Sequence, residues 1–138
     1  FRDDLIAIMA TDHPLAGRKN IYAEDFKTYN LVTYSTDRAS GWEYDRFFAP
    51  ASILPRRMIT VELIEAIVEL VRSGYGISIL QRDLVTPSLE RGELAWAALN
   101  EGLDIAWNAI IRPSEAEGSE VNQMVTELSN WIKSAEKS

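Results

Sequence analysis

The stretch TVELIEAIVELVRSGYGISIL, from Thr60 to Leu80, constrains the fold more than any other part of the sequence. Its first half has apolar residues at helical spacing, with charged residues on the opposite side, as in a helix with one buried face. We expect Thr60 to cap this helix and Glu62 to lie in its first turn. The residues expected on the buried face are Leu63, Ile64, Ile67, Val68 and Val71, and those on the wet face are Glu65, Glu69 and Arg72.

Two glycines separate this helix from the apolar run between Ile77 and Leu80. We expect Gly74 to supply the left-handed residue that ends the helix, and Gly76 to allow a tight turn into a strand. A helix joined so closely to a buried strand is typical of an α/β sheet.

The remaining segments continue this alternation of strands and helices, which predicts an α/β fold with helices on both faces of the sheet. We predict further strands at residues 5–10, 31–35, 56–61, 93–99 and 103–112. Helical segments are expected at residues 22–30, from Ser40 to near Pro50, as a short turn over residues 82–92, and at residues 119–133. The apolar face of the last helix comprises Val121, Met124, Val125, Leu128 and Ile132.

Composition excludes several classes of function. The chain has 138 residues, suited to one domain, and its net charge of -7 argues against direct binding of DNA or anionic lipid. It contains no cysteine, which excludes disulfides and thiolate metal sites, and its one histidine, His13, is expected to be structural. No apolar run reaches membrane-spanning length, and we expect no metal and no cofactor. Because the chain enters a strand almost at once, we interpret it as a fragment of a longer protein.

No catalytic motif is present, so we expect no enzymatic activity. The strongest functional candidate is the loop YSTDRASG, which places Ser35, Thr36, Arg38 and Ser40 between a strand end and a helix start. Hydroxyl groups and free N–H groups there can bind an anion, and Arg38 can clamp a carboxylate. The alternative is that Ser40 only caps a helix and Arg38 is solvated.

A second loop, Thr60-Val61-Glu62, follows another strand end. Taken alone it is better explained as a helix cap. Ligands of open α/β sheets bind beyond the carboxyl ends of strands, so two such loops on one sheet edge favour a cleft. The tryptophans Trp42, Trp96, Trp107 and Trp131 are expected to be packing residues rather than a binding platform.

Three sequence marks occur in order along the chain: DHPLA at Asp12–Ala16, G-x-G-I-x-x-L at Gly74–Leu80, and RGEL at Arg91–Leu94. With these marks the chain resembles the effector-binding domain of LysR-type transcriptional regulators. The segments EGLDIAWNAIIR and YSTDRAS are similar to the methionine-biosynthesis regulators of that family.

The resemblance implies one part of a two-lobed domain similar to type II periplasmic binding proteins, with a small effector bound between the lobes. Residues 1–10 and 104–112 match two crossover strands, residues 11–103 match the second lobe, and residues 113–138 match a linker and a helix of the first lobe. The resemblance implies that most of the first lobe and the DNA-binding domain lie outside this chain. The family further implies a cytoplasmic homodimer or homotetramer that contacts DNA through its N-terminal domain and has no contact with a membrane.

The effector contacts implied by the family are Ser35, Thr36, Arg38 and Ser40; Thr60, Val61 and Glu62; and Leu80 and Gln81. The chain has Gln81 and Ala10 where family members often have proline. Gln81 puts a polar group near the cleft and leaves the type of effector open: amino-acid-like or anionic. Two alternatives remain. A solute-binding protein of a transport system has the same two-lobed fold, and an enzyme on this fold needs an aligned reactive residue that the sequence does not offer.

Overall fold

The computed structural model describes residues 2–34, 43–106 and 119–135. The chain divides into two compact units. One comprises residues 3–105, and the other contains the C-terminal helix; each is described by itself.

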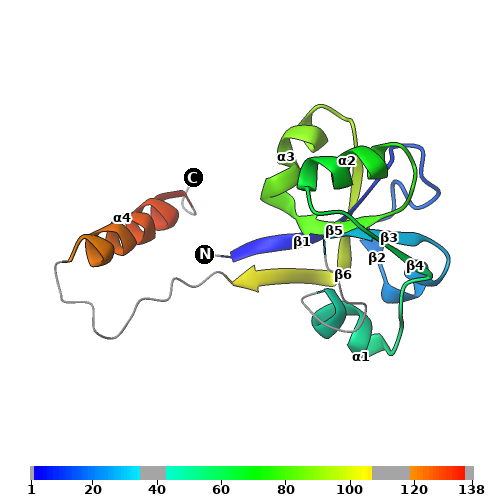
Figure 1. Cartoon of the computed structure of the whole chain (residues 1–138), viewed down its shortest axis with the longest axis horizontal. Coiled ribbons are helices and arrows are strands. Elements are labelled where there is room, and N and C mark those ends of the chain that lie inside the picture. The colour runs from blue at the N-terminus through cyan, green and yellow to red at the C-terminus, as the bar shows by residue number, and fades with distance from the viewer. Residues whose placement is uncertain (1, 35–42, 107–118, 136–138) are drawn as a thin grey trace. The chain divides into compact units, whose positions relative to one another are not determined.

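The first unit is built on a mixed β-sheet (Figure 1). Four strands lie in the order β2-β6-β1-β5, and a pair, β3-β4, lies beside them. Two hydrogen bonds connect β3 of this pair to the chain just before β5 of the four-stranded sheet. The Val32 N–H donates to the Ile77 carbonyl at 2.8 Å, and the Ile77 N–H donates to the Asn30 carbonyl at 2.9 Å. The strands are β1 (Arg2–Met9), β2 (Asn20–Ile21), β3 (Asn30–Thr33), β4 (Arg57–Thr60), β5 (Ser78–Gln81) and β6 (Ala95–Ala106).

Strand direction brings three carboxyl ends to one edge of the sheet. β3 runs parallel to β4, with Thr33 opposite Thr60, and parallel to the chain at Ile77 that leads into β5. β1 runs antiparallel to β5, so Leu5, near its start, lies opposite Gln81. Residues 34, 61 and 82, which follow β3, β4 and β5, therefore lie along the same edge.

Helices cover both faces of the sheet, as the alternating pattern predicted. Figure 1 shows α2 and α3 on one face and the segment containing α1 on the other. The helices are the 3-10 helix η1 (Ala23–Lys27), the π-helix η2 (Tyr44–Phe48), α1 (Ala49–Ala51), α2 (Ile64–Arg72), α3 (Arg82–Glu90) and α4 (Glu120–Ala135). Among the described helices, none is both long and apolar enough to cross a membrane.

A separate apolar core lies under each layer of helices. On the η1 and η2 side, Phe26, Phe47 and Phe48 pack edge to face with centroid distances of 5.0–5.7 Å. On the other side, Ile67 and Val71 of α2 are fully buried against the sheet. The alternation of β1 divides its side chains between the two cores, with Ile6 and Ile8 facing α2 and α3.

The start of α2 differs from the sequence prediction. Leu63, rather than Thr60, occupies the N-cap position, and Glu62 lies before the helix. Thr60 is still part of β4, and the N–H of Val61 donates to the Thr33 carbonyl at 2.9 Å, which extends the sheet by one more bond. Leu63 is 64% exposed rather than buried, because the chain remains extended there. The other expected core positions, Ile64, Ile67, Val68 and Val71, are buried or half-buried.

The two glycines after α2 have different roles. Gly74 adopts φ +80°, the predicted left-handed conformation. At Gly76 a Cβ atom would lie 2.5 Å from the carbonyl oxygen of Asn30, so only glycine lets this turn pass so close to β3. The turn is thereby fixed against the sheet.

Two further predictions, for the segments that form β6 and α3, were wrong. β6 is one continuous strand where two were expected, with a bend at Asn100 and Gly102, whose φ angles are 50° and 120°. The expected short turn after β5 is the nine-residue helix α3, which accommodates Pro87 within it. The end of the second expected strand, residues 107–112, lies outside the described residues.

The second unit contains α4, which begins and ends within two residues of its predicted bounds. The Ser119 hydroxyl accepts the N–H of Asn122 at 3.3 Å and so caps the helix. Trp131 is 69% exposed on this helix. Trp96 is 43% exposed and packs against the guanidinium of Arg82, whereas Trp42 and Trp107 lie outside the described residues.

Candidate functional site

The candidate site is the sheet edge formed by the carboxyl ends of β3, β4 and β5. Parallel strands direct their connecting loops to this edge, where α/β folds bind ligands. Of the predicted site residues, Ser35, Thr36, Arg38 and Ser40 lie outside the described residues, between β3 and η2. The other five lie at the ends of β4 and β5.

Thr60, Val61 and Glu62 continue directly from β4. Thr60 and Glu62 are exposed, and Val61 is half-buried. The bond from the Val61 N–H to the Thr33 carbonyl, at 2.9 Å, fixes this segment beside the end of β3. The two predicted loops therefore leave the sheet from neighbouring strands.

Leu80 and Gln81 end β5 on the other side of β3. The Leu80 side chain is buried in the core below α2 and α3. Gln81 is half-buried and occupies the N-cap position of α3, where its side chain makes no capping hydrogen bond. Gln81 is the last residue of β5 and therefore lies at this edge of the sheet.

A buried carboxylate that the sequence analysis did not select lies at this edge. Glu43 is 7% exposed, and the fully buried Thr33 hydroxyl donates to its two oxygens at 2.9 and 3.2 Å. Burial raises the pKa of Glu43, and the hydrogen bond from Thr33 opposes this shift. The signal for its burial was its position four residues before Phe47, a spacing that places both on one helix face.

Tyr34 follows Thr33 in the chain, and its phenol is close enough to Glu43 to be affected by the negative charge of that carboxylate. Its side chain is 43% exposed. Its pKa is raised by partial burial and by the negative charge of Glu43. The end of β3 thus combines a buried acid with an accessible aromatic ring.

An arginine lies just beyond β5. The Arg82 guanidinium stacks 3.8 Å from the ring centroid of Trp96 and pairs with Asp4 at 3.6 Å. Stacking of this kind fixes the plane of a guanidinium group and leaves its edge free to donate hydrogen bonds. Because Asp4 belongs to β1, this ion pair places the positive charge of Arg82 near the start of that strand.

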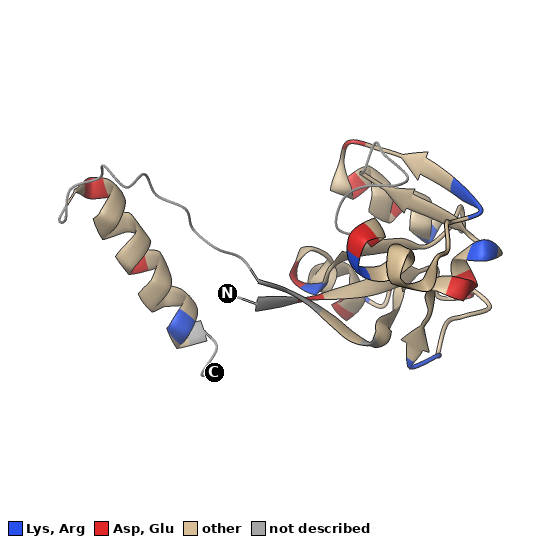
Figure 2. Cartoon of the chain, turned by 90° about the horizontal axis from the view of Figure 1, so that it is seen from below, with Lys and Arg blue, Asp and Glu red and all other residues tan. Residues whose placement is uncertain are grey.

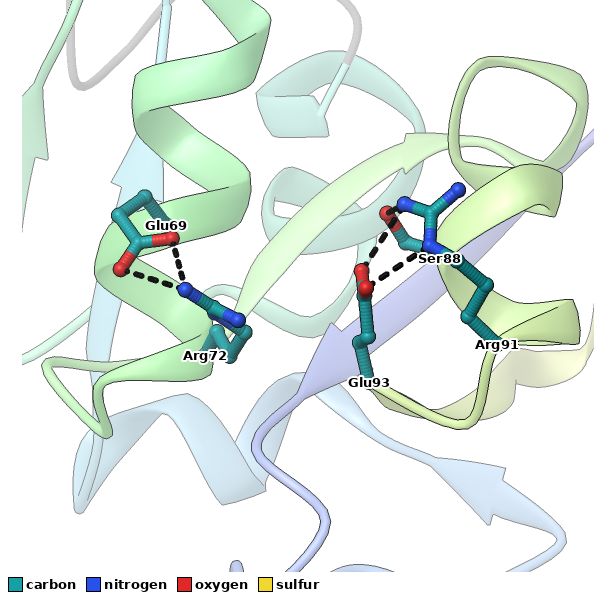
Figure 3. Close-up of polar contacts among 5 residues, drawn as sticks. All are labelled: Glu69, Arg72, Ser88, Arg91 and Glu93. Carbon is teal, nitrogen blue, oxygen red and sulfur yellow. Dashed lines mark hydrogen bonds and ion pairs between the residues drawn. The ribbon is translucent and has the colours of Figure 1, made fainter.

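The polar contacts in Figure 3 lie where α2 and α3 end, at the opposite ends of the helices from this site. Arg72 pairs with Glu69 at 2.7 Å, and Arg91 pairs with Glu93 at 2.8 Å. The Arg91 hydrogen bond lowers the pKa of Glu93. These are exposed surface pairs with no role in the candidate site.

His13 is structural, as predicted. Its Nδ1 accepts the N–H of Leu15 at 3.2 Å, and its ring packs edge-on against Tyr29 with centroids 4.5 Å apart. Burial lowers its pKa, which favours the neutral imidazole. Within the described ranges, no three His, Cys, Asp or Glu side chains are grouped to hold a metal ion.

Acidic and basic residues are interspersed over the described part of the lobe (Figure 2). With a net charge of -7 over the whole sequence, this distribution differs from the basic stripe of a nucleic-acid surface. The described residues therefore do not form the kind of surface that binds a phosphate backbone.

Residues 1–133 match the family model of the LysR substrate binding domain. The chain belongs to this family, as the three sequence marks predicted. The fold agrees: the regulatory domain of MetR, a LysR family regulator from N. meningitidis, superposes with a TM-score of 0.81 at 32% identity, covering 89% of this chain and 57% of that one. The periplasmic-binding-protein type II-like fold expected from the sequence is thereby confirmed.

Curated relatives are transcriptional regulators. MetR of Escherichia coli K12 is 26% identical over 137 residues, which cover 94% of this chain and 43% of that protein. CysL of Bacillus subtilis is 29% identical over 101 residues, covering 72% of this chain and 34% of that protein. The chain therefore spans less than half the length of these relatives. A further structure, the effector binding domain of QuiR in complex with shikimate, aligns at 30% identity and a TM-score of 0.59 over 81% of this chain and 56% of that one.

Proposed function

We propose that this chain is the effector-sensing part of a LysR-type transcriptional regulator, which binds a small metabolite and thereby controls DNA binding by the whole protein. The match to the LysR substrate binding domain over residues 1–133 carries this proposal. Support also comes from QuiR, a neighbour solved with the small molecule shikimate. The regulator names of the relatives favour this function over solute transport or catalysis.

In this proposal the regulator is a cytoplasmic homo-oligomer, a dimer or tetramer, with DNA contacts in an N-terminal domain. Residues 1–10 and 104–112 are the crossover strands, residues 11–103 form the second lobe, and residues 113–138 lead through α4 to the first lobe. The exposed apolar side chains of α4 support this assignment, because such a face needs an apolar neighbour. They are Val121, Met124, Leu128 and Trp131.

The proposed effector site lies along the carboxyl ends of β3, β4 and β5. It comprises Thr60, Val61, Glu62, Leu80 and Gln81, together with the loop residues Ser35, Thr36, Arg38 and Ser40. The shared edge of the three strands supports it. Effector binding shifts the equilibrium between two arrangements of lobes or subunits, since a ligand favours the arrangement that it binds more tightly.

The test is to measure ligand binding by the intact regulator by calorimetry, after a thermal-shift screen of amino acids and small carboxylates. We expect Arg38→Ala and Thr60→Val to weaken binding about tenfold, the cost of one hydrogen bond to a charged group, without lowering stability. Glu65→Gln is the matched control, because Glu65 lies on the exposed face of α2. Unchanged affinity in both site variants would exclude these loops from the site.

A further inference from the structure

We propose that Glu43 binds a positively charged amino group of the effector, and that Thr33 positions its carboxylate. This inference rests on the proposed sensing function and adds the chemical class of the ligand: a metabolite that carries a protonated amine. Neither residue was among the predicted contacts.

The location of Glu43 connects it to the candidate site. Its partner Thr33 is the last residue of β3, and the Thr33 carbonyl accepts the N–H of Val61 at 2.9 Å. The Thr33–Glu43 pair therefore lies where the chain leaves β3 and β4, the edge at which α/β folds bind ligands. A ligand at this edge meets Glu43 beside Val61 and Tyr34.

The hydrogen bonding of Glu43 is incomplete for a buried carboxylate. An ionised carboxylate offers about four lone-pair positions. The single hydroxyl hydrogen of Thr33 is shared between both oxygens, at 2.9 and 3.2 Å. No ion pair among the described residues involves Glu43. A buried charge is costly unless a cation compensates it, and an amine on the ligand supplies that cation.

Three other acids of the same unit have an arginine partner. Asp25 pairs with Arg18 at 2.8 Å, Glu69 with Arg72 at 2.7 Å, and Glu93 with Arg91 at 2.8 Å. Each of these acids has an arginine nearby in the sequence. Glu43 is buried whereas Asp25 and Glu93 are half-buried and Glu69 is exposed, which is the reverse of what a solubilising surface charge requires.

The neighbouring aromatic ring favours an organic cation. Tyr34 directly follows Thr33 in the chain and is 43% exposed. An ammonium group is attracted both by a carboxylate and by the face of an aromatic ring. A divalent metal ion needs several oxygen ligands, and no cluster of three acidic or histidine side chains occurs in the part of the chain that the structure describes.

The experiment uses the intact regulator and a defined panel: the standard L-amino acids, and for each its 2-hydroxy acid, which replaces the amine by a neutral hydroxyl. We expect the wild type to bind at least one amino acid at least tenfold more tightly than its hydroxy analogue. Glu43→Gln should weaken amino-acid binding about tenfold, the value of one charge-assisted hydrogen bond. It should change hydroxy-acid binding much less, an asymmetry that a purely structural role does not produce.

Asp45→Asn is the matched control, since it removes the same charge from an exposed position two residues away. Thr33→Val is a second variant, which keeps its shape while removing the positioning hydroxyl, and should also reduce the preference for the amine. Equal binding of amino acids by wild type and Glu43→Gln overturns the inference. If only hydroxy acids bind, the sensing function stands and this inference fails. If neither class binds, this inference fails, and the sensing function is decided by the thermal-shift screen of the other small carboxylates.

Discussion

The hydroxyl of Thr33 donates to both carboxylate oxygens of Glu43, at 2.9 and 3.2 Å, inside the lobe and at the end of β3. One hydrogen serves two acceptors in a place with little water. Because burial raises the pKa of Glu43, this relationship links the stability of the first unit to pH.

We predict that Glu43→Gln raises the free energy of unfolding, relative to the wild type, more at pH 7 than at pH 4. Burial raises the folded-state pKa of Glu43 above 4.5, the unfolded value. The stability linked to its neutral form is therefore fully present below pH 4.5 and is lost as pH rises through the folded pKa. Urea unfolding at both pH values measures the difference. A stability gain equal at the two pH values would contradict the prediction.

Glu93 should show the opposite pH dependence. The hydrogen bond from Arg91 lowers its folded-state pKa, so its contribution to stability is present at pH 7 and is lost as pH falls through that value. Glu93→Gln should destabilise slightly at pH 7 and leave stability unchanged near pH 3. Because the pair is exposed, 0.5 M NaCl (about a 4 Å screening length) should remove most of the effect. Persistence in salt would indicate a different cause.

Ile67→Ala should destabilise by about 2–5 kcal/mol, because it removes a fully buried side chain from the core beneath α2. Leu63→Ala, one turn earlier, should change stability by less than about 0.5 kcal/mol, because Leu63 is exposed. Chemical denaturation of the two variants measures both values. Similar losses would mean that α2 begins before Leu63, as the sequence pattern predicted.

Gly76→Ala should destabilise by about 1–3 kcal/mol, since its methyl group would be forced against the backbone of β3. Gly74→Asn is the matched control: it lies in open space with φ +80°, a conformation that asparagine tolerates. Thermal unfolding of both variants tests this. The prediction is wrong if the two losses are equal.

Local patterns predicted those parts of the fold that depend on neighbouring residues. The helical spacing of Ile67 and Val71 and the left-handed Gly74 are properties of a few adjacent residues, and the structure confirms both. The start of α2 was wrong because the bond between Val61 and Thr33 joins residues 28 positions apart (61 minus 33). No local pattern around Thr60 contains that bond.

The same contrast between local patterns and distant contacts applies to the candidate site. The sequence predicted that the ends of β4 and β5 share an edge, because parallel strands with helical connections must do so. It did not single out Glu43, because the acid looked like one more charged residue of a helix and its burial depends on Thr33, ten positions earlier. The loop residues Ser35, Thr36, Arg38 and Ser40 remain predictions.

β1 and β6 are neighbours in the sheet, and Figure 1 shows β6 running back toward the start of β1. The polypeptide thus arrives in the lobe and departs from it at almost the same place. A module attached in this way can be transplanted into another host protein without disturbing its own core.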